Sequence, residues 1–182
     1  MRVVRLPVLF VVAALLGALL PLGTARAAGM QFVADGKGRF RIGFPAGWRV
    51  SVPPGDTPAV LGVDDAQSGR PYLNVNVVIE SLPRPLSPAE YARMSKPLMA
   101  ATFHEFRVLQ EGSARIARRD AYYRYYTWRS NTGNPLYQVQ AYFTVGRQGY
   151  VLTGTTVNSP GRVRRDVPVI SQIFETFAPS VR

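Results

Sequence analysis

The side chains that most often supply nucleophilic or metal chemistry are scarce in this sequence. It has no cysteine and one histidine, His104. Thiol catalysis, cysteine-ligated zinc and lipid attachment through a cysteine are therefore excluded, and so are metal sites built from several histidines. No GxSxG elbow, phosphate-binding glycine loop or zinc-protease helix occurs in the chain. We predict no catalytic residue, no metal and no cofactor.

Two weaker arrangements offer alternatives to that prediction. His104 is flanked by aromatic residues near a predicted helix end, which is more typical of a helix-terminus histidine than of a general base. Asp56, Asp64 and Asp65 have the oxygen ligands that a hard cation prefers. Their spacing matches no calcium loop, and adjacent aspartates in a loop are usually solvated. Both arrangements therefore favour structural or surface roles.

Residues 122–129 form an aromatic stretch, YYRYYTWR, that is the most unusual local feature of the chain. In a strand, alternate residues point to opposite faces. One face then carries Tyr122, Arg124, Tyr126 and Trp128. The other carries Tyr123, Tyr125 and Arg129. We expect both faces to lie under helices, because tyrosine suits half-buried positions. The functional alternative is an exposed surface of aromatic and arginine side chains that binds a sugar, lipid or protein partner. The first set of four are candidate binding residues.

The first 27 residues have the pattern of a secretory signal peptide. Arg2 and Arg5 precede an uncharged apolar run at 8–20, and Ala25-Arg26-Ala27 supplies a signal-peptidase site. The alternative, an uncleaved anchor, needs about 20 apolar residues to span a bilayer, and the run is shorter. We therefore predict cleavage after Ala27 and a mature protein in the periplasm or secreted.

The predicted mature chain, residues 28–182, is strongly basic. The whole chain carries a net charge of +11, and loss of the three arginines of the signal segment leaves +8. Arg162, Arg164 and Arg165 form a cluster before the predicted terminal helix. Solvated surface charge is the simplest explanation, and weak, salt-sensitive association with an anionic envelope component or membrane surface is the alternative. Nucleic acid is not an expected partner in that compartment.

Alternation of apolar and polar residues predicts a series of strands in one domain, 28–182. The clearest is 72–80, and a hairpin joins 136–145 to 150–157 through a glycine-containing turn. Further strands are predicted at 40–44, 48–52, 59–63, 107–116 and 121–129. We place Trp48, which follows the turn at Gly47, in the core.

Two amphipathic helices complete the predicted fold. The first has Ser87 as N-cap, Pro88 at the first helical position and Glu90 three residues after the cap, and Pro97 predicts a kink or an early end near Ser95. Its apolar stripe is expected at Tyr91, Met94, Leu98 and Ala101. The terminal helix is expected to begin at Asp166 as N-cap, with Pro168 in its first turn. Antiparallel strands with helices packed on the sheet define an α+β fold.

Three stretches of the sequence carry a family resemblance: Phe40-x-Ile42-x-Phe44-Pro45-Ala46-Gly47-Trp48, the hairpin of Gln138–Tyr142 with Gly149–Gly154, and the closing Ile173-Phe174-x-Thr176-Phe177. Together they resemble PsbP-like and DcrB-like exported domains. The resemblance implies an α/β/α sandwich, with helices flanking an antiparallel central sheet. It also implies non-catalytic roles, as extrinsic subunits or assembly factors at photosynthetic membranes or as envelope proteins, and it supplies no catalytic residues.

These observations favour an exported, non-enzymatic protein that binds a protein or another envelope component. The alternative is a periplasmic carrier of a small molecule or lipid, with a pocket between sheet and helix, and a hydrolase of unfamiliar type is a third hypothesis. A contiguous apolar cavity of roughly 300–1,000 Å³ would favour the carrier. A flat surface of arginine and tyrosine would favour the partner-binding protein.

Overall fold

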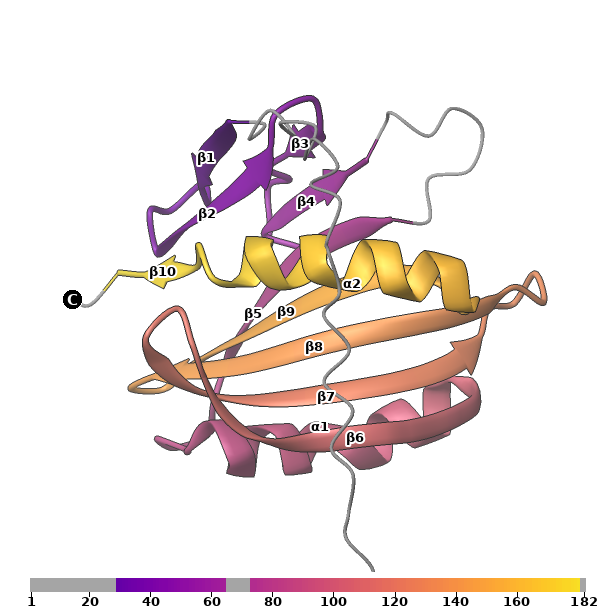
Figure 1. The fold of residues 1–182 in the computed structure, drawn as a ribbon. Helices are drawn as coiled ribbons and strands as arrows, with labels where there is room; N and C mark the ends of the chain where they lie inside the picture. The colour runs from indigo at the N-terminus through magenta and orange to yellow at the C-terminus, as the bar shows by residue number, and fades with distance from the viewer. Residues whose placement is uncertain (1–28, 65–72, 181–182) are drawn as a thin grey trace, which may run out of the picture.

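The computed structural model describes residues 29–64 and 73–180, which fold into two antiparallel sheets and two helices (Figure 1). The predicted signal peptide, residues 1–27, and Asp65 lie outside these described residues. The larger sheet has seven strands in the order β3-β4-β5-β9-β8-β7-β6. Their bounds are β3 Arg49–Ser51, β4 Val60–Val63, β5 Asn74–Ser81, β6 His104–Ile116, β7 Arg119–Arg129, β8 Pro135–Val145 and β9 Gln148–Val157.

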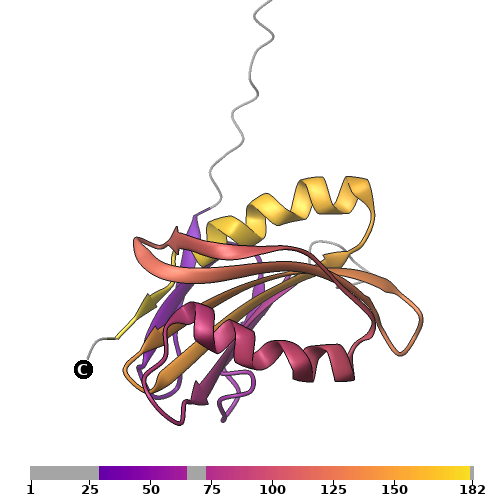
Figure 2. The same cartoon turned by 90° about the horizontal axis from the view of Figure 1, so that it is seen from below.

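The smaller sheet has three strands in the order β1-β2-β10. They are β1 Met30–Ala34, β2 Phe40–Pro45 and β10 Ala178–Pro179. The two helices are α1 Pro88–Thr102 and α2 Pro160–Phe174. α1 packs on β6, β7 and β8, whereas α2 packs on β9, β8 and β2. Figure 2 shows the two helices on opposite sides of the large sheet. The sheet-dominated α+β class is confirmed, and β1 and β10 are strands that no sequence pattern predicted.

The main apolar core lies between α2 and the two sheets. It joins β2, through Phe40 and Phe44, to Val139 of β8, Leu152 of β9 and Ile170 of α2. Trp48 belongs to this core, as predicted, with 8% of its surface exposed and its ring 6.0 Å from that of Phe44 between centroids. Burial of this apolar area is the main force that holds the small sheet against the large one.

The first helix begins as predicted and ends later than predicted. Ser87 accepts a hydrogen bond from the Glu90 amide at 3.3 Å, and the Glu90 carboxylate accepts one from the Ser87 amide at 2.8 Å, which completes a capping box. The helix continues through Pro97, because Met99 beyond it is buried against the sheet. Tertiary packing there outweighs the local cost of the proline.

The apolar stripe predicted for the first helix was correct at Tyr91 and wrong at Met94, Leu98 and Ala101. Tyr91, Ala92 and Met99 face the sheet, whereas Met94 is 51% and Leu98 72% exposed. The buried stripe is therefore displaced around the helix from the one that hydrophobicity alone suggested, since polar groups of α1 are bonded to the sheet below.

The N-cap of the terminal helix lies seven residues earlier than predicted. Ser159 is its N-cap residue and Pro160 occupies the first turn, so the predicted start at Asp166 was wrong. Asp166 is 1% exposed and lies within the helix, where it accepts a hydrogen bond from the hydroxyl of Thr156 in β9. A tertiary contact thus explains an aspartate that looks like a cap in the sequence.

Candidate functional site

The predicted aromatic strand is β7, and α1 covers one of its faces. The face carrying the candidate binding residues points toward this helix. Arg124 and Tyr126 are 0% exposed, which agrees with the expectation that this face lies under a helix. The alternative, in which they are binding residues on a surface, was wrong for both. Trp128 is half-buried, with its ring 4.5 Å from that of Phe103 between centroids, and Tyr122 packs beside the smaller core under α1. This face of the strand stabilises the attachment of α1.

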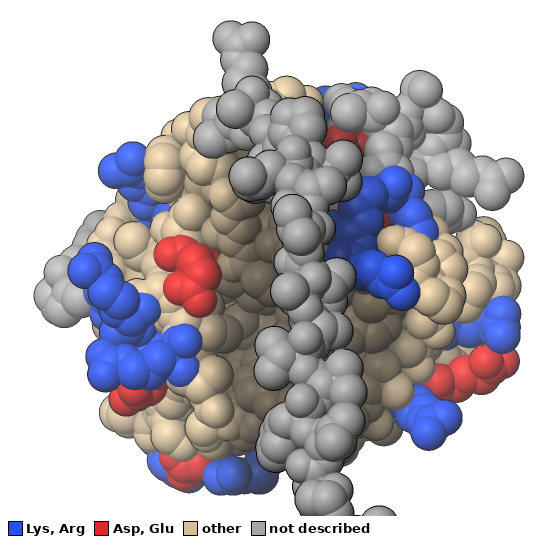
Figure 3. All heavy atoms as spheres, viewed as in Figure 1, with Lys and Arg blue, Asp and Glu red and all other residues tan. Residues whose placement is uncertain are grey.

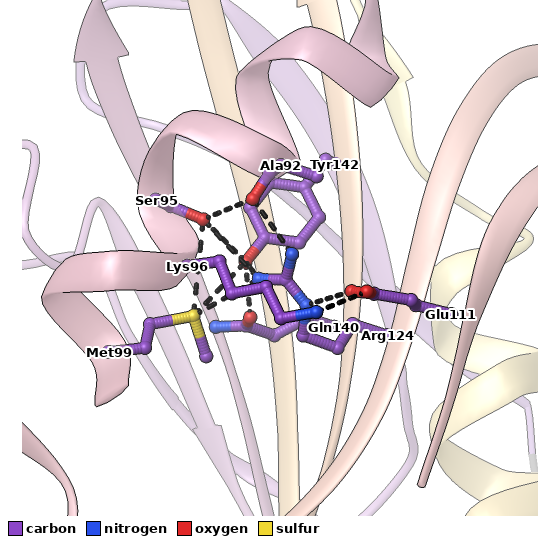
Figure 4. A network of polar contacts seen from close by, with 8 residues as sticks. All are labelled: Ala92, Ser95, Lys96, Met99, Glu111, Arg124, Gln140 and Tyr142. Atoms are coloured by element: carbon purple, nitrogen blue, oxygen red, sulfur yellow. Dashed lines mark hydrogen bonds and ion pairs between the residues drawn. The ribbon is translucent and has the colours of Figure 1, made fainter. Parts of the chain in front are cut away.

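Arg124 is the centre of a polar network between the sheet and α1 (Figure 4). Its Nε donates to Glu111 Oε2 at 2.7 Å, its Nη1 donates to the Tyr142 hydroxyl at 3.0 Å, and its Nη2 donates to the Ala92 carbonyl at 2.8 Å. Lys96 of α1 also binds Glu111, at 2.5 Å. A guanidinium buried this deeply is tolerated because its donors are directed at oxygen acceptors.

The electrostatics of this network match a structural role. Partial burial acts to raise the pKa of Glu111, but hydrogen bonds from Lys96 and Arg124 together hold it below the usual value for glutamate. Burial raises the pKa of Tyr142. Glu111 is therefore ionised and Tyr142 is neutral at neutral pH, the states that the observed hydrogen bonds require.

The opposite face of β7 carries the tyrosines that remain accessible. Tyr123 and Tyr125 lie side by side on it, with ring centroids 5.4 Å apart, and Tyr137 of β8 stacks on Tyr125 at 6.3 Å. All three are half-buried. Since α2 packs on β9, β8 and β2, it leaves this part of the sheet open. The result is a groove, here called the tyrosine groove, between α2 and the β6–β7 pair.

The tyrosine groove has a volume of about 250 Å³ and a lining that is mostly apolar. Its walls are formed by Ala114, Ile116, Tyr123, Tyr125, Val139, Gln140, Ser171, Phe174 and Glu175. Figure 3 shows the corresponding hollow below α2 with few charged side chains inside it. Burial raises the pKa of Tyr125 and of Tyr137, so both phenols are neutral and can donate hydrogen bonds. The Tyr123 hydroxyl already accepts a bond from Gln110 Nε2 at 2.9 Å.

Sequence reasoning placed Tyr123 and Tyr125 on the face opposite to the candidates and did not include them. The alternation of the strand was predicted correctly, but nothing in it shows which face a helix covers. Tyr137 was missed as well, because its position beside Tyr125 depends on the register in which β8 pairs with β7. A neutral aromatic groove of this kind can bind an apolar or aromatic side chain of a partner.

The predicted arginine cluster lies in the first turns of α2. Arg162 and Arg165 both bind the buried Asp166, with N–O distances of 3.1 Å and 2.8 Å, whereas Arg164 is exposed. Two of the three arginines are therefore ion-paired with Asp166, which itself binds Thr156 of β9. The cluster does not present three equivalent free charges.

The alternative sites considered from the sequence also have structural explanations. Asp56 binds Arg39 at 2.6 Å and Lys37 at 3.4 Å, and the hydrogen bond from Arg39 lowers its pKa. His104 is exposed at the start of β6, directly after α1. Within residues 29–64 and 73–180, no group of three or more histidine, cysteine, aspartate or glutamate side chains could hold a metal. In the same part of the chain, no helix is long and apolar enough to cross a membrane.

Comparison with solved structures defines the class of the fold. Cyanobacterial PsbP (CyanoP) from Synechocystis sp. PCC 6803 superposes with a TM-score of 0.60 at 15% identity, covering 91% of this chain and 99% of that one. The Ran-binding protein Mog1p of Saccharomyces cerevisiae gives 0.57 at 10%, covering 85% and 97%. LpqN of Mycobacterium tuberculosis gives 0.54 at 14%, covering 82% and 90%. The chain thus has the fold shared by PsbP and Mog1.

The family follows from sequence. The profile of the DcrB family matches residues 63–166, more than half of the chain, and the chain belongs to that family. The resemblance deduced from the strand, hairpin and closing motifs is confirmed. No curated protein matches the chain significantly in sequence.

Proposed function

We propose that the chain is an exported, non-enzymatic protein of the cell envelope that binds another protein through the tyrosine groove. The observation that supports this most directly is the pair Tyr123 and Tyr125, whose rings lie side by side in the lining of the groove. Tyr137 of β8 stacks on Tyr125 beside the groove. Tyrosine supplies a large apolar area and a hydrogen-bonding group at little entropic cost, and it is enriched where proteins bind each other.

The compartment and the partner class have independent support. The first 27 residues read as a signal peptide, and LpqN, which shares the fold, is described as involved in cell envelope biogenesis. Mog1p, another protein of this fold, is described as Ran-binding, so the scaffold can carry a protein-binding surface. The basic net charge of the present chain favours a partner whose binding surface has an acidic rim.

The volume of the groove argues for a protein partner over an enclosed small molecule. About 250 Å³ is available, whereas pockets that enclose drug-sized ligands have roughly 300–1,000 Å³. Ala114 and Ile116 of β6, the edge strand of the large sheet, also line the groove, so it lies where a segment of a larger partner could reach it from the side. A periplasmic carrier therefore remains the less favoured alternative.

Site-specific photocrosslinking in the native envelope tests the proposal. A photoreactive phenylalanine analogue replaces Tyr125 in the groove or Leu98 on the outer face of α1, a matched control because Leu98 is 72% exposed and distant from the groove residues. We expect a discrete adduct from position 125, absent from position 98, that is lost on adding Tyr123→Ala. The same adducts from both positions, or none from position 125, would contradict groove binding.

A further inference from the structure

The turn between β6 and β7 has an unusual backbone. Ile116 pairs with Arg119, which leaves Ala117 and Arg118 as a two-residue loop. Both have positive φ, 52° and 60°, in the left-handed region that favours glycine or asparagine. Non-glycine residues in this region are uncommon and concentrate at functional sites. This turn therefore holds a conformation that its own residues do not prefer.

Contacts from both sides hold the turn in place. The Ala117 amide donates to Glu175 Oε2, just after α2, at 2.7 Å, and Arg115 Nη2 donates to the Arg118 carbonyl at 2.9 Å. Glu175 thereby links the hairpin to the C-terminal end of α2. The arginines around the turn consequently project from a backbone that is tied to the rest of the fold.

Three arginines of this hairpin line one hollow. Arg115, Arg118 and Arg119 surround a space of about 400 Å³, here called the arginine hollow, which also borders Asp120 and Pro179. Within the described parts of the chain, 29–64 and 73–180, none of the three forms an ion pair, in contrast to Arg39, Arg124, Arg129, Arg162 and Arg165. Figure 3 shows basic side chains gathered at the left, over the β6–β7 turn.

We propose that the arginine hollow binds a phosphate monoester, either on a lipid headgroup or on a soluble compound. The hollow has a net charge of +2, because three guanidinium groups are offset by the single carboxylate of Asp120. A phosphate monoester carries about −1.5 to −2 at neutral pH and offers three acceptor oxygens. Guanidinium forks match these oxygens in a bidentate way, which lysine cannot do.

A carboxylate is the less suitable ligand for this site. One arginine satisfies a carboxylate with two parallel hydrogen bonds, so three arginines around one hollow exceed what an aspartate or glutamate side chain needs. The inference is independent of the tyrosine groove, because the hollow is formed by different residues at the tip of the hairpin. Either proposal can fail without the other.

Titration of the purified exported protein with inorganic phosphate and with glycerol 3-phosphate, followed by amide chemical shifts, tests for the soluble form. Co-sedimentation with vesicles of phosphatidic acid in phosphatidylcholine, against phosphatidylcholine alone, tests for the lipid form. The variant Arg118→Gln/Arg119→Gln removes two of the charges from exposed or half-buried positions. The matched control is Arg164→Gln, which removes an exposed arginine from α2.

We expect the shifts to map to residues 115–120 and the affinity to fall at least about tenfold in Arg118→Gln/Arg119→Gln, with less than a twofold change in Arg164→Gln. Binding of the soluble phosphates alone assigns a soluble ligand, and binding of the vesicles assigns a lipid. The same loss of binding free energy per charge removed in both variants would show general charge attraction and overturn the proposal. Absence of binding in both formats, or stronger binding of glutamate than of phosphate, would overturn it as well.

Discussion

Replacing Arg124 by methionine tests the role that the structure gives this residue. The side chain is 0% exposed and donates to Glu111, Tyr142 and the Ala92 carbonyl. If it holds α1 to the sheet, the substitution lowers the free energy of unfolding strongly. If it serves a partner at the surface, stability changes little.

The magnitude follows from the contacts that are lost. Each hydrogen bond to a charged group contributes about 1.5–3 kcal/mol, and the bonds to Glu111, Tyr142 and the Ala92 carbonyl are all removed. Burial of the methionine side chain restores part of this, and Glu111 retains Lys96 at 2.5 Å, so the carboxylate is not left alone. We expect Arg124→Met to cost about 3–5 kcal/mol, the range measured when one partner of a buried pair is removed. That is a large share of the roughly 5–15 kcal/mol of a typical domain.

Urea unfolding followed by circular dichroism measures this change, with Arg129→Met as the matched control. Arg129 lies in the same strand and binds Glu105 at 2.9 Å, but both side chains are solvent-exposed, 44% and 67%. An exposed pair of this kind contributes only about 0.2–1 kcal/mol. Equal costs for the two substitutions, or a cost below about 1 kcal/mol for Arg124→Met, would refute the structural role.

A double-mutant cycle with Glu111→Gln isolates the pair itself. Because the two side chains are in contact, the double variant should lose about 1–3 kcal/mol less than the sum of the single variants. The pKa of Glu111 is lower in the folded state than in the unfolded state. Its stabilising contribution is therefore complete above the unfolded pKa and disappears as the pH falls through the folded pKa. The wild type should lose stability in acid more steeply than Glu111→Gln, and parallel pH profiles would contradict this.

Three further predictions concern the core, the strained turn and the N-terminus. Trp48→Ala should cost about 3–5 kcal/mol because the ring is 8% exposed in the core, and an unchanged melting curve would contradict it. Ala117→Gly should raise the free energy of unfolding by about 1 kcal/mol, because glycine adopts the positive φ without a steric penalty; no gain in urea unfolding would show that the turn is unstrained. The exported protein should begin at Ala28, and an intact mass that retains residues 1–27 would exclude the predicted cleavage.

Local patterns in the sequence predicted the elements that depend on nearby residues. The alternation at 72–80 corresponds to β5, Asn74–Ser81, and the predicted hairpin corresponds to β8 and β9. The capping box at Ser87 was also readable, because both of its hydrogen bonds join residues three apart. Each of these signals is satisfied within one strand pair or one helical turn.

Features set by distant contacts could not be read in the same way. Asp166 resembled an N-cap, but its hydroxyl partner, Thr156, lies on a strand beneath the helix. The apolar stripe of α1 was misplaced for a similar reason, since Ser95 and Ala92 face the sheet and accept or donate hydrogen bonds there. A polar residue that is satisfied by tertiary contacts looks solvent-exposed to any hydrophobicity pattern.

The tyrosine groove exists because α2 leaves one face of β7 uncovered. The position of α2 on the sheet therefore determines whether the groove is open. Ile170 of α2 sits directly over Gly154 of β9, so closely that any Cβ on this residue would overlap the Ile170 side chain. The missing side chain lets the helix settle over β9, away from β7. A larger residue at position 154 would force α2 off β9 and alter the width of the tyrosine groove. The opening beside Tyr123 and Tyr125 thus follows from a glycine two strands away, which is why alternation within β7 alone could not reveal it.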